Sequence, residues 1–118
     1  MSKRDTHATL SQILHHAQLA EQLCHGRTLP EFVRDWKSSL ALERILEIIG
    51  EAVKRLPSEV CASYPAVEWR LVAGMRDRLS HGYDDVDYEI LWNVVQEDLP
   101  KLIATVEQMI SEMGEDLG

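Results

Sequence analysis

Apolar residues recur every three or four positions through most of this chain, which is the spacing of a helix with one buried face. The first such stripe predicts a helix over residues 3–24 and comprises Leu10, Ile13, Leu14, Ala17, Ala20 and Cys24. A second stripe predicts a helix that ends near residue 56 and comprises Leu42, Ile45, Leu46, Ile49, Ala52, Val53 and Leu56. No segment alternates apolar and polar residues as a half-buried strand does. The sequence therefore predicts an all-α protein.

Local signals predict where the helices begin and end. Thr28 is the expected cap of a short helix between the two stripes, and Ser38 or Ser39 is the expected cap of the helix that ends near residue 56. Gly50 lowers the stability of that helix and borders its apolar face. We therefore expect a neighbouring helix to pack closely against Gly50.

Two further helices are predicted in the second half of the chain. The fourth ends near Gly82 and carries the apolar residues Val67, Trp69, Val72, Met75 and Leu79. Asp85 or Asp87 caps the fifth, which Pro100 kinks or restarts and which ends near residue 113, with residues 114–118 frayed. The pattern favours one domain, residues 1–118, folded as an up-and-down bundle of four to five helices.

Charge and composition restrict the functional classes. The formal net charge of −8 argues against loose, non-specific nucleic-acid binding, although a local basic groove is compatible with it. No apolar run approaches the ~20 residues that cross a membrane, and the N-terminal residues lack the apolar core of a signal peptide. Cys24 and Cys61 fit no metal-ligand or redox spacing, which favours buried thiols in a reducing cytoplasm.

The sequence predicts neither a metal site nor a cofactor site. His15 and His16 are adjacent, so they do not form the i, i+4 pair that suits a metal site on a helix. Asp84, Asp85 and Asp87 lack the glycine and the closing glutamate of a calcium loop. The chain contains no glycine-rich phosphate loop and no nucleophile elbow.

Residues 76–83 concentrate the side chains that are most useful for chemistry. An arginine such as Arg76 binds phosphate with a planar fork of donors, and a histidine such as His81 exchanges protons near neutral pH. The pair suits phosphodiester cleavage or phosphate binding. Spacing alone favours a simpler interpretation, in which His81 eases the dipole at a helix end and Arg76 is solvated.

Helix geometry limits how these side chains can cooperate. On an ideal helix Arg76 and His81 lie about 140° apart, so either the helix unwinds before Gly82 or two chains bring their copies together. Asp77 shares a face with His81 and could fix its tautomer, although an ordinary surface contact is more common for such a pair. Tyr83 follows the glycine on an expected loop. Its hydroxyl could bind phosphate or be modified, but packing beneath the loop is the favoured alternative.

Several blocks of the sequence resemble one known family. The pattern Arg76-x-x-x-x-His81-x-Tyr83 is similar to the motif of the HepT toxins, HEPN-domain ribonucleases encoded beside a minimal nucleotidyltransferase antitoxin. Further resemblance extends over about residues 5–113, in the blocks 48–56, 64–65, 69–70, 73–76, 86–92 and 98–100. The resemblance implies an all-helical HEPN-like homodimer in which the two motif copies face each other.

The resemblance also implies roles for individual residues. His81 would be the acid and base, and Arg76 would stabilise the charged phosphorane during metal-independent attack of a ribose 2′-hydroxyl on the adjacent phosphate. Tyr83 would be the residue to which the antitoxin attaches AMP. Asp77, at a position that is commonly asparagine in the family, would orient His81.

RNA binding by so acidic a chain would require a narrow basic groove, which we expect Arg70, Arg76 and Arg78 to form. Two alternatives remain open. The chain could be a non-catalytic helical subunit of a nucleotidyltransferase, with Arg76 and Tyr83 contacting the partner or its nucleotide. It could also be a structural dimer with the motif packed away from solvent.

Overall fold

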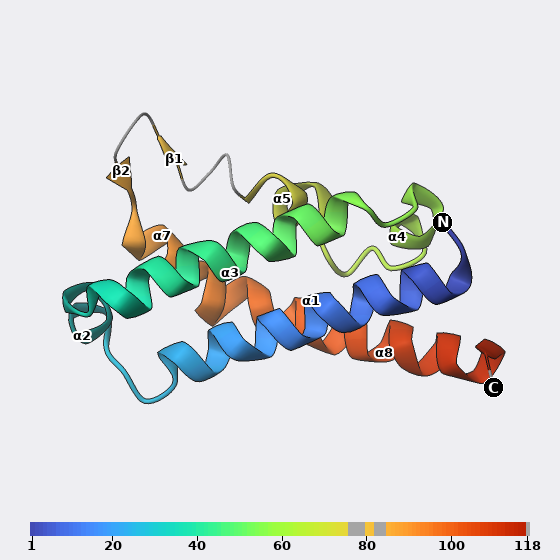
Figure 1. Cartoon of the computed structure of the whole chain (residues 1–118), viewed down its shortest axis with the longest axis horizontal. Coiled ribbons are helices and arrows are strands. Elements are labelled where there is room, and N and C mark those ends of the chain that lie inside the picture. The colour runs from blue at the N-terminus through green and yellow to red at the C-terminus, as the bar shows by residue number, and fades with distance from the viewer. Residues whose placement is uncertain (76–79, 82–84, 118) are drawn as a thin grey trace.

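Three long helices form the body of the protein (Figure 1). The computed structural model describes residues 1–75, 80–81 and 85–117, with the backbone alone at 80–81, 85–86 and 115–117. The order of elements is α1 (Lys3–Cys24), α2 (Leu29–Arg34), α3 (Trp36–Lys54), α4 (Ser58–Ala62), α5 (Trp69–Ala73), β1 (Ser80–His81), β2 (Asp85–Val86), α7 (Tyr88–Asn93), a π-helical turn (Val94–Asp98) and α8 (Leu99–Leu117). The all-α prediction and the bundle architecture are confirmed.

Helix α1 lies at the centre of the packing because it contacts both α3 and α8. It runs antiparallel to each of them, so that the N-terminus and the end of α8 lie at the same end of the bundle (Figure 1). Side chains from all three helices meet in one apolar core, whose fully buried members include Leu10, Ile13, Leu42, Leu46, Ile49, Leu102 and Val106. Within the described residues, no helix has the length and apolar character needed to span a membrane.

The first two helices begin and end as the sequence predicts. Helix α1 has the predicted bounds, and Gly26 follows it with a φ of 74°, a backbone conformation that favours glycine. Thr28 caps α2 in a reciprocal capping box with Glu31, which confirms the predicted cap. These local signals therefore determine the direction in which the chain leaves α1.

The predicted cap of α3 is wrong. Asp35 is the cap, and Ser38 and Ser39 lie buried in the first turn of the helix. The Ser38 hydroxyl donates to the Asp35 carboxylate at 2.7 Å, Arg27 forms an ion pair with the same carboxylate at 3.1 Å, and Ser39 donates to the carbonyl of Phe32 at 3.1 Å. The hydrogen bonds from Ser38 lower the pKa of Asp35. Contacts with preceding residues therefore select Asp35 over the two serines.

Gly50 makes the close helix contact that the sequence predicts. A Cβ atom at this position would lie 3.2 Å from the carbonyl oxygen of Val72 and 3.4 Å from that of Ala73. Both oxygens belong to the backbone of α5, so the contact fixes how closely α5 approaches α3. The absence of a side chain at Gly50 is a requirement of the packing.

We expect Gly50→Val to lower the free energy of unfolding by about 1–3 kcal/mol, because two backbones cannot separate without disturbing the core between them. Thermal unfolding followed by circular dichroism measures the loss. Gly114→Val is the matched control, because Gly114 lies in α8 and a Cβ there meets no atom within 4 Å. Equal losses in the two variants would show that helix propensity, and not the contact with α5, is responsible.

The fourth predicted helix is wrong at its C-terminal end. Helix α5 ends at Ala73, and Ser80 and His81 form an antiparallel pair with Val86 and Asp85. The helix therefore does not extend through Ser80 and His81 to the expected end, because the backbone of these two residues is extended and paired with β2. Leu79 and Gly82 themselves lie outside the described residues.

Pro100 has the effect on the last helix that its chemistry predicts. Proline has no amide hydrogen and its ring crowds the carbonyl four residues earlier. The backbone widens into the π-helical turn directly before α8, which then continues to Leu117, beyond the predicted end near residue 113.

Asp87 caps α7, its carboxylate accepting from the amides of Glu89 and Ile90 at 3.0 and 3.3 Å. Of the two predicted caps, Asp87 is therefore the one used.

Candidate active site

The motif segment joins α5 to α7 and includes the β1–β2 pair. Figure 1 shows this pair beyond α3, on the side away from α1 and α8. His81 belongs to β1 and pairs with Asp85, and its backbone alone is described. The other residues predicted for the motif lie outside the described residues: Arg76, Asp77, Arg78 and Tyr83.

The first end of the motif segment is anchored in the core. Val72 and Met75 are buried, and the carbonyls of Val72 and Ala73 press against Gly50 of α3. Met75 directly precedes Arg76 in the sequence. The chain therefore enters the motif from a position that the packing of α5 on α3 determines.

The second end of the motif segment is also held by packing. Asp87 caps α7, Leu91 of that helix is fully buried, and the ring of Trp92 lies 5.5 Å from that of Phe32 on α2. Residues 76–86 thus bridge two anchored helices. Such an arrangement suits a site, because a loop held by a rigid scaffold can present reactive side chains to solvent.

The extended backbone at His81 removes the geometric obstacle derived from an ideal helix. The separation of about 140° applies only if the helix continues without interruption from Arg76 to His81. Because Ser80 and His81 form a strand, the chain has left the helical path before Gly82. Of the two solutions considered above, the backbone matches the one in which the helix unwinds.

Arg70 is the only residue of the predicted basic groove whose side chain is described, and it is exposed on α5. It borders a mainly apolar hollow of about 710 Å³ whose lining includes Trp69, Leu71, Cys61 and Pro65. The indole of Trp69 donates to the carbonyl of Tyr64 at 3.0 Å, which holds the start of α5 against the preceding loop. Arg70 is therefore available to a ligand.

In the described part of the chain, no group of three or more histidine, cysteine, aspartate or glutamate side chains could hold a metal ion.

Cys24 and Cys61 are free thiols, the first buried and the second half-buried. Burial raises the pKa of the Cys24 thiol to about 11. Burial also raises the pKa of Cys61.

The raised pKa of Cys24 predicts how stability depends on pH. Below pH 9, the ordinary pKa of the thiol, Cys24 is protonated in both the folded and the unfolded protein. Between pH 9 and about 11 the unfolded chain ionises first, so this contribution to stability is lost as the pH rises. We expect Cys24→Ala to show a weaker decrease in melting temperature over this range than the wild type. Parallel curves for the two proteins would contradict the assignment.

One surface feature is missing from the sequence-based predictions. Trp36 and Leu40 are both exposed at the start of α3. The expected cap at Ser38 or Ser39 places Trp36 outside the helix, where its spacing of four from Leu40 carries no meaning. That i, i+4 spacing is the signal that indicates a second apolar face on α3.

Comparison with known proteins identifies the family. The family model described as "Ribonuclease HepT-like" matches residues 13–109, a range that includes the helices on both sides of the motif and the motif itself. The chain belongs to the HepT-like ribonuclease family. The resemblance stated from the motif is thereby confirmed, and this HepT-like chain is assigned to the RNA-cleaving enzymes.

Curated relatives cover nearly the whole HepT-like chain. A candidate RNase of Methanocaldococcus jannaschii is 39% identical, over 98% of this chain and 97% of its own. The "Probable ribonuclease HepT" of Thermococcus cleftensis is 37% identical, over 91% of this chain and 97% of its own. A longer M. jannaschii protein, named as a gamma-glutamylcyclotransferase and candidate RNase, is 33% identical over 97% of this chain and 51% of its own. No solved structure matches the chain.

Proposed function

We propose that this protein is a toxin that cleaves RNA without a metal ion, acts as a homodimer in the cytoplasm, and is neutralised by a minimal nucleotidyltransferase. The match of residues 13–109 to the HepT-like ribonuclease family carries this proposal. The motif Arg76-x-x-x-x-His81-x-Tyr83 lies inside that range and on a segment anchored at both ends. We treat residues 1–118 as a single HEPN-like domain.

The proposed reaction is an intramolecular transfer within the RNA. His81 accepts the proton of a ribose 2′-hydroxyl, and the resulting oxygen attacks the adjacent phosphorus. The bond to the 5′-oxygen of the next nucleotide breaks, and that oxygen receives a proton. The products are a 2′,3′-cyclic phosphate and a 5′-hydroxyl. Arg76 stabilises the additional negative charge of the phosphorane, and Asp77 orients the imidazole.

Three arginines are proposed to hold the RNA backbone. Arg70 is exposed beside the hollow on α5, and Arg76 and Arg78 follow within the motif segment. Because the chain has a net charge of −8, phosphate binding depends on this local concentration of positive charge. We expect affinity for RNA to decrease steeply with salt.

Tyr83 is the proposed site of regulation. Attachment of AMP to its hydroxyl by the antitoxin adds a bulky group with a negative charge, two residues from His81. Such a group repels the phosphates of the RNA and occupies the space that the substrate needs. Modification therefore inhibits cleavage without any change in fold.

Purified wild-type protein incubated with RNA in the presence of EDTA tests the proposed reaction. We expect fragments that end in 2′,3′-cyclic phosphate. Cleavage that appears only when magnesium is added would refute the metal-independent reaction. If no cleavage occurs in either condition, and the intact mass shows no added AMP, the chain is better described as a binding subunit of the nucleotidyltransferase.

A further inference from the structure

Three large apolar side chains are exposed in one short stretch at the junction of α2 and α3. Trp36 is 65% exposed, Leu40 51% and Val33 45%. Trp36 and Leu40 are four residues apart on α3 and therefore share a face. Exposed tryptophan and leucine side chains that lie together are typical of a surface that a partner covers. We call Val33, Trp36 and Leu40 the α3 patch.

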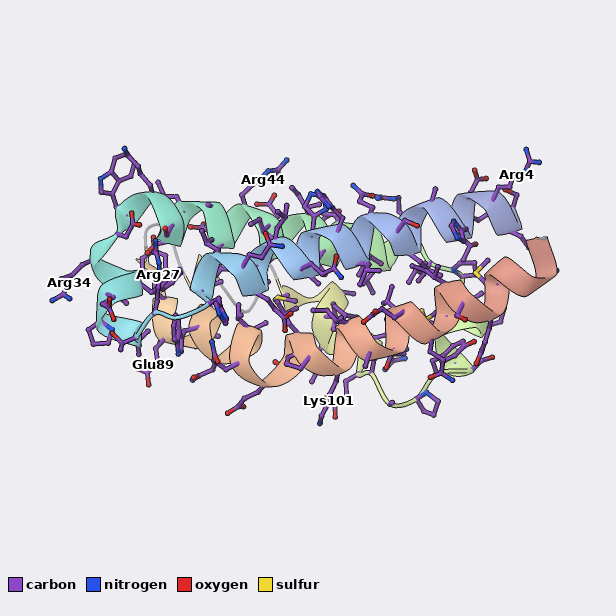
Figure 2. All side chains as sticks on the ribbon, turned by 90° about the horizontal axis from the view of Figure 1, so that it is seen from below. Arg4, Arg27, Arg34, Arg44, Glu89 and Lys101 are labelled. Atoms are coloured by element: carbon purple, nitrogen blue, oxygen red, sulfur yellow. The ribbon has the colours of Figure 1, made fainter. Side chains whose placement is uncertain are left out.

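Charged residues of both signs surround the α3 patch. Around α3, Trp36, Leu40, Arg44 and Glu47 fall within about 80° of one another. Arg44 and Glu47 form an ion pair at 3.2 Å. Figure 2 shows Arg44 pointing outward from α3 on the side away from α8. The exposed face of α3 thus has an apolar part and a mixed-charge part that follow one another along the helix.

The local charge balance favours a second copy of the chain as the partner. Residues 33–47 contain three cations and three carboxylates: Arg34, Lys37, Arg44, Asp35, Glu43 and Glu47. This stretch is therefore neutral in a chain of net charge −8, so two copies that meet here avoid the repulsion between their acidic surfaces. A symmetric interface places the same patch on both sides and needs charges of both signs to pair with itself. A basic partner would bind an acidic surface more strongly than this neutral one.

The same observations argue against RNA as the occupant. Aliphatic side chains such as Val33 and Leu40 offer no ring on which a base can stack. The ammonium group of Lys37 lies 5.7 Å from the centre of the Trp36 ring, so one face of the only aromatic ring in the patch already has a cation against it. A neutral surface also provides little attraction for a polyanion.

The α3 patch can provide the apolar centre of a dimer interface, although not the whole of it. A tryptophan alone buries about 150–250 Å², whereas a stable interface needs about 800 Å² from each partner. The patch can provide the apolar centre, and Lys37, Arg44, Glu43 and Glu47 can provide the polar rim. We propose that the homodimer of the proposed function forms through the α3 patch, with the N-terminal half of α3 packed against its copy.

Two leucine variants test this interface. Leu40→Glu introduces a carboxylate into the proposed contact, whereas Leu71→Glu introduces one on α5 at a leucine of nearly equal exposure, 49%. We expect sedimentation equilibrium to give the wild type and Leu71→Glu twice the chain mass of 13.5 kDa. Leu40→Glu should raise the dimer dissociation constant by about 30-fold or more, because charge replaces apolar contact at the centre of the interface.

Trp36→Ala provides a second variant, which removes apolar area without adding charge and should also weaken the dimer. Circular dichroism confirms that each variant is folded. A monomeric wild type, loss of the dimer in both leucine variants, or its retention in both would overturn the proposal. A dimeric Leu40→Glu that binds a single-stranded oligonucleotide less tightly than the wild type would overturn it in favour of RNA.

The outcome is independent of the proposed catalysis. If Leu40→Glu weakens the dimer while the wild type cleaves no RNA, the interface is supported and the ribonuclease activity is refuted. A monomeric wild type that cleaves RNA would do the reverse.

Discussion

His81→Ala should reduce RNA cleavage by about 10²–10⁴-fold, the range typical of losing one general acid–base group. In the proposed reaction no other residue removes the proton from the 2′-hydroxyl, so the loss should appear in the rate at saturating RNA. Single-turnover cleavage of a labelled oligonucleotide measures this rate directly. Expression of the variant in cells should correspondingly permit growth where the wild type prevents it.

A structural role for His81 can be separated from a catalytic one. The backbone of His81 pairs with Asp85, and alanine retains the backbone groups that make this pair. The variant should therefore melt at the same temperature as the wild type and have the same oligomeric mass. Arg76→Lys is a second variant, which tests the role of the arginine. Lysine retains the charge but loses the planar fork that binds two phosphate oxygens. Unchanged cleavage in a folded His81→Ala protein would contradict the proposed mechanism.

Tyr83→Phe should abolish neutralisation by the nucleotidyltransferase while leaving RNA cleavage active. The substitution removes one oxygen atom, which is the proposed acceptor of the adenylyl group, and retains the ring. After incubation with the nucleotidyltransferase and ATP, intact mass spectrometry should show one adenylyl group on the wild type and none on the variant. The variant should remain toxic when both proteins are expressed together.

Two controls make the result for Tyr83 specific. Tyr64→Phe removes a hydroxyl that lies outside the motif and donates to Glu112, and it should leave modification unchanged. The unmodified wild type and Tyr83→Phe should cleave RNA at similar rates. An adenylyl group on Tyr83→Phe, or equal loss of modification in Tyr64→Phe, would show that Tyr83 is not the acceptor.

The parts of the fold that the sequence predicts are those that local chemistry determines. The stripe in α1 gives its bounds, Thr28 and Glu31 satisfy the first amides of α2, and Gly50 indicates a close neighbour. Each of these signals lies within a few residues of the feature that it predicts. The period of 3.6 residues then orders the long helices, since each must bury one face.

The errors occur where a distant contact decides between local possibilities. Ser38 and Asp35 are both good cap residues, and the ion pair from Arg27 and the bond from Ser39 to Phe32 favour the earlier one. The β1–β2 pair contains two residues in each strand, too few for any period to be recognised. For the candidate site, the motif could be predicted by resemblance. Helix geometry leaves two arrangements open, unwinding of the helix before Gly82 or pairing of two chains, and only the extended backbone at Ser80 and His81 favours the first.

The shared location of the two chain ends has a practical consequence for fusion proteins. Because the N-terminus and the end of α8 lie at one end of the bundle, while the β1–β2 pair lies towards the other (Figure 1), a second domain joined at either terminus extends away from the motif. The longer relative of M. jannaschii, which this chain matches over 51% of its length, has room for a domain of this kind. Affinity tags and fluorescent reporters can therefore be attached at either terminus without approaching His81.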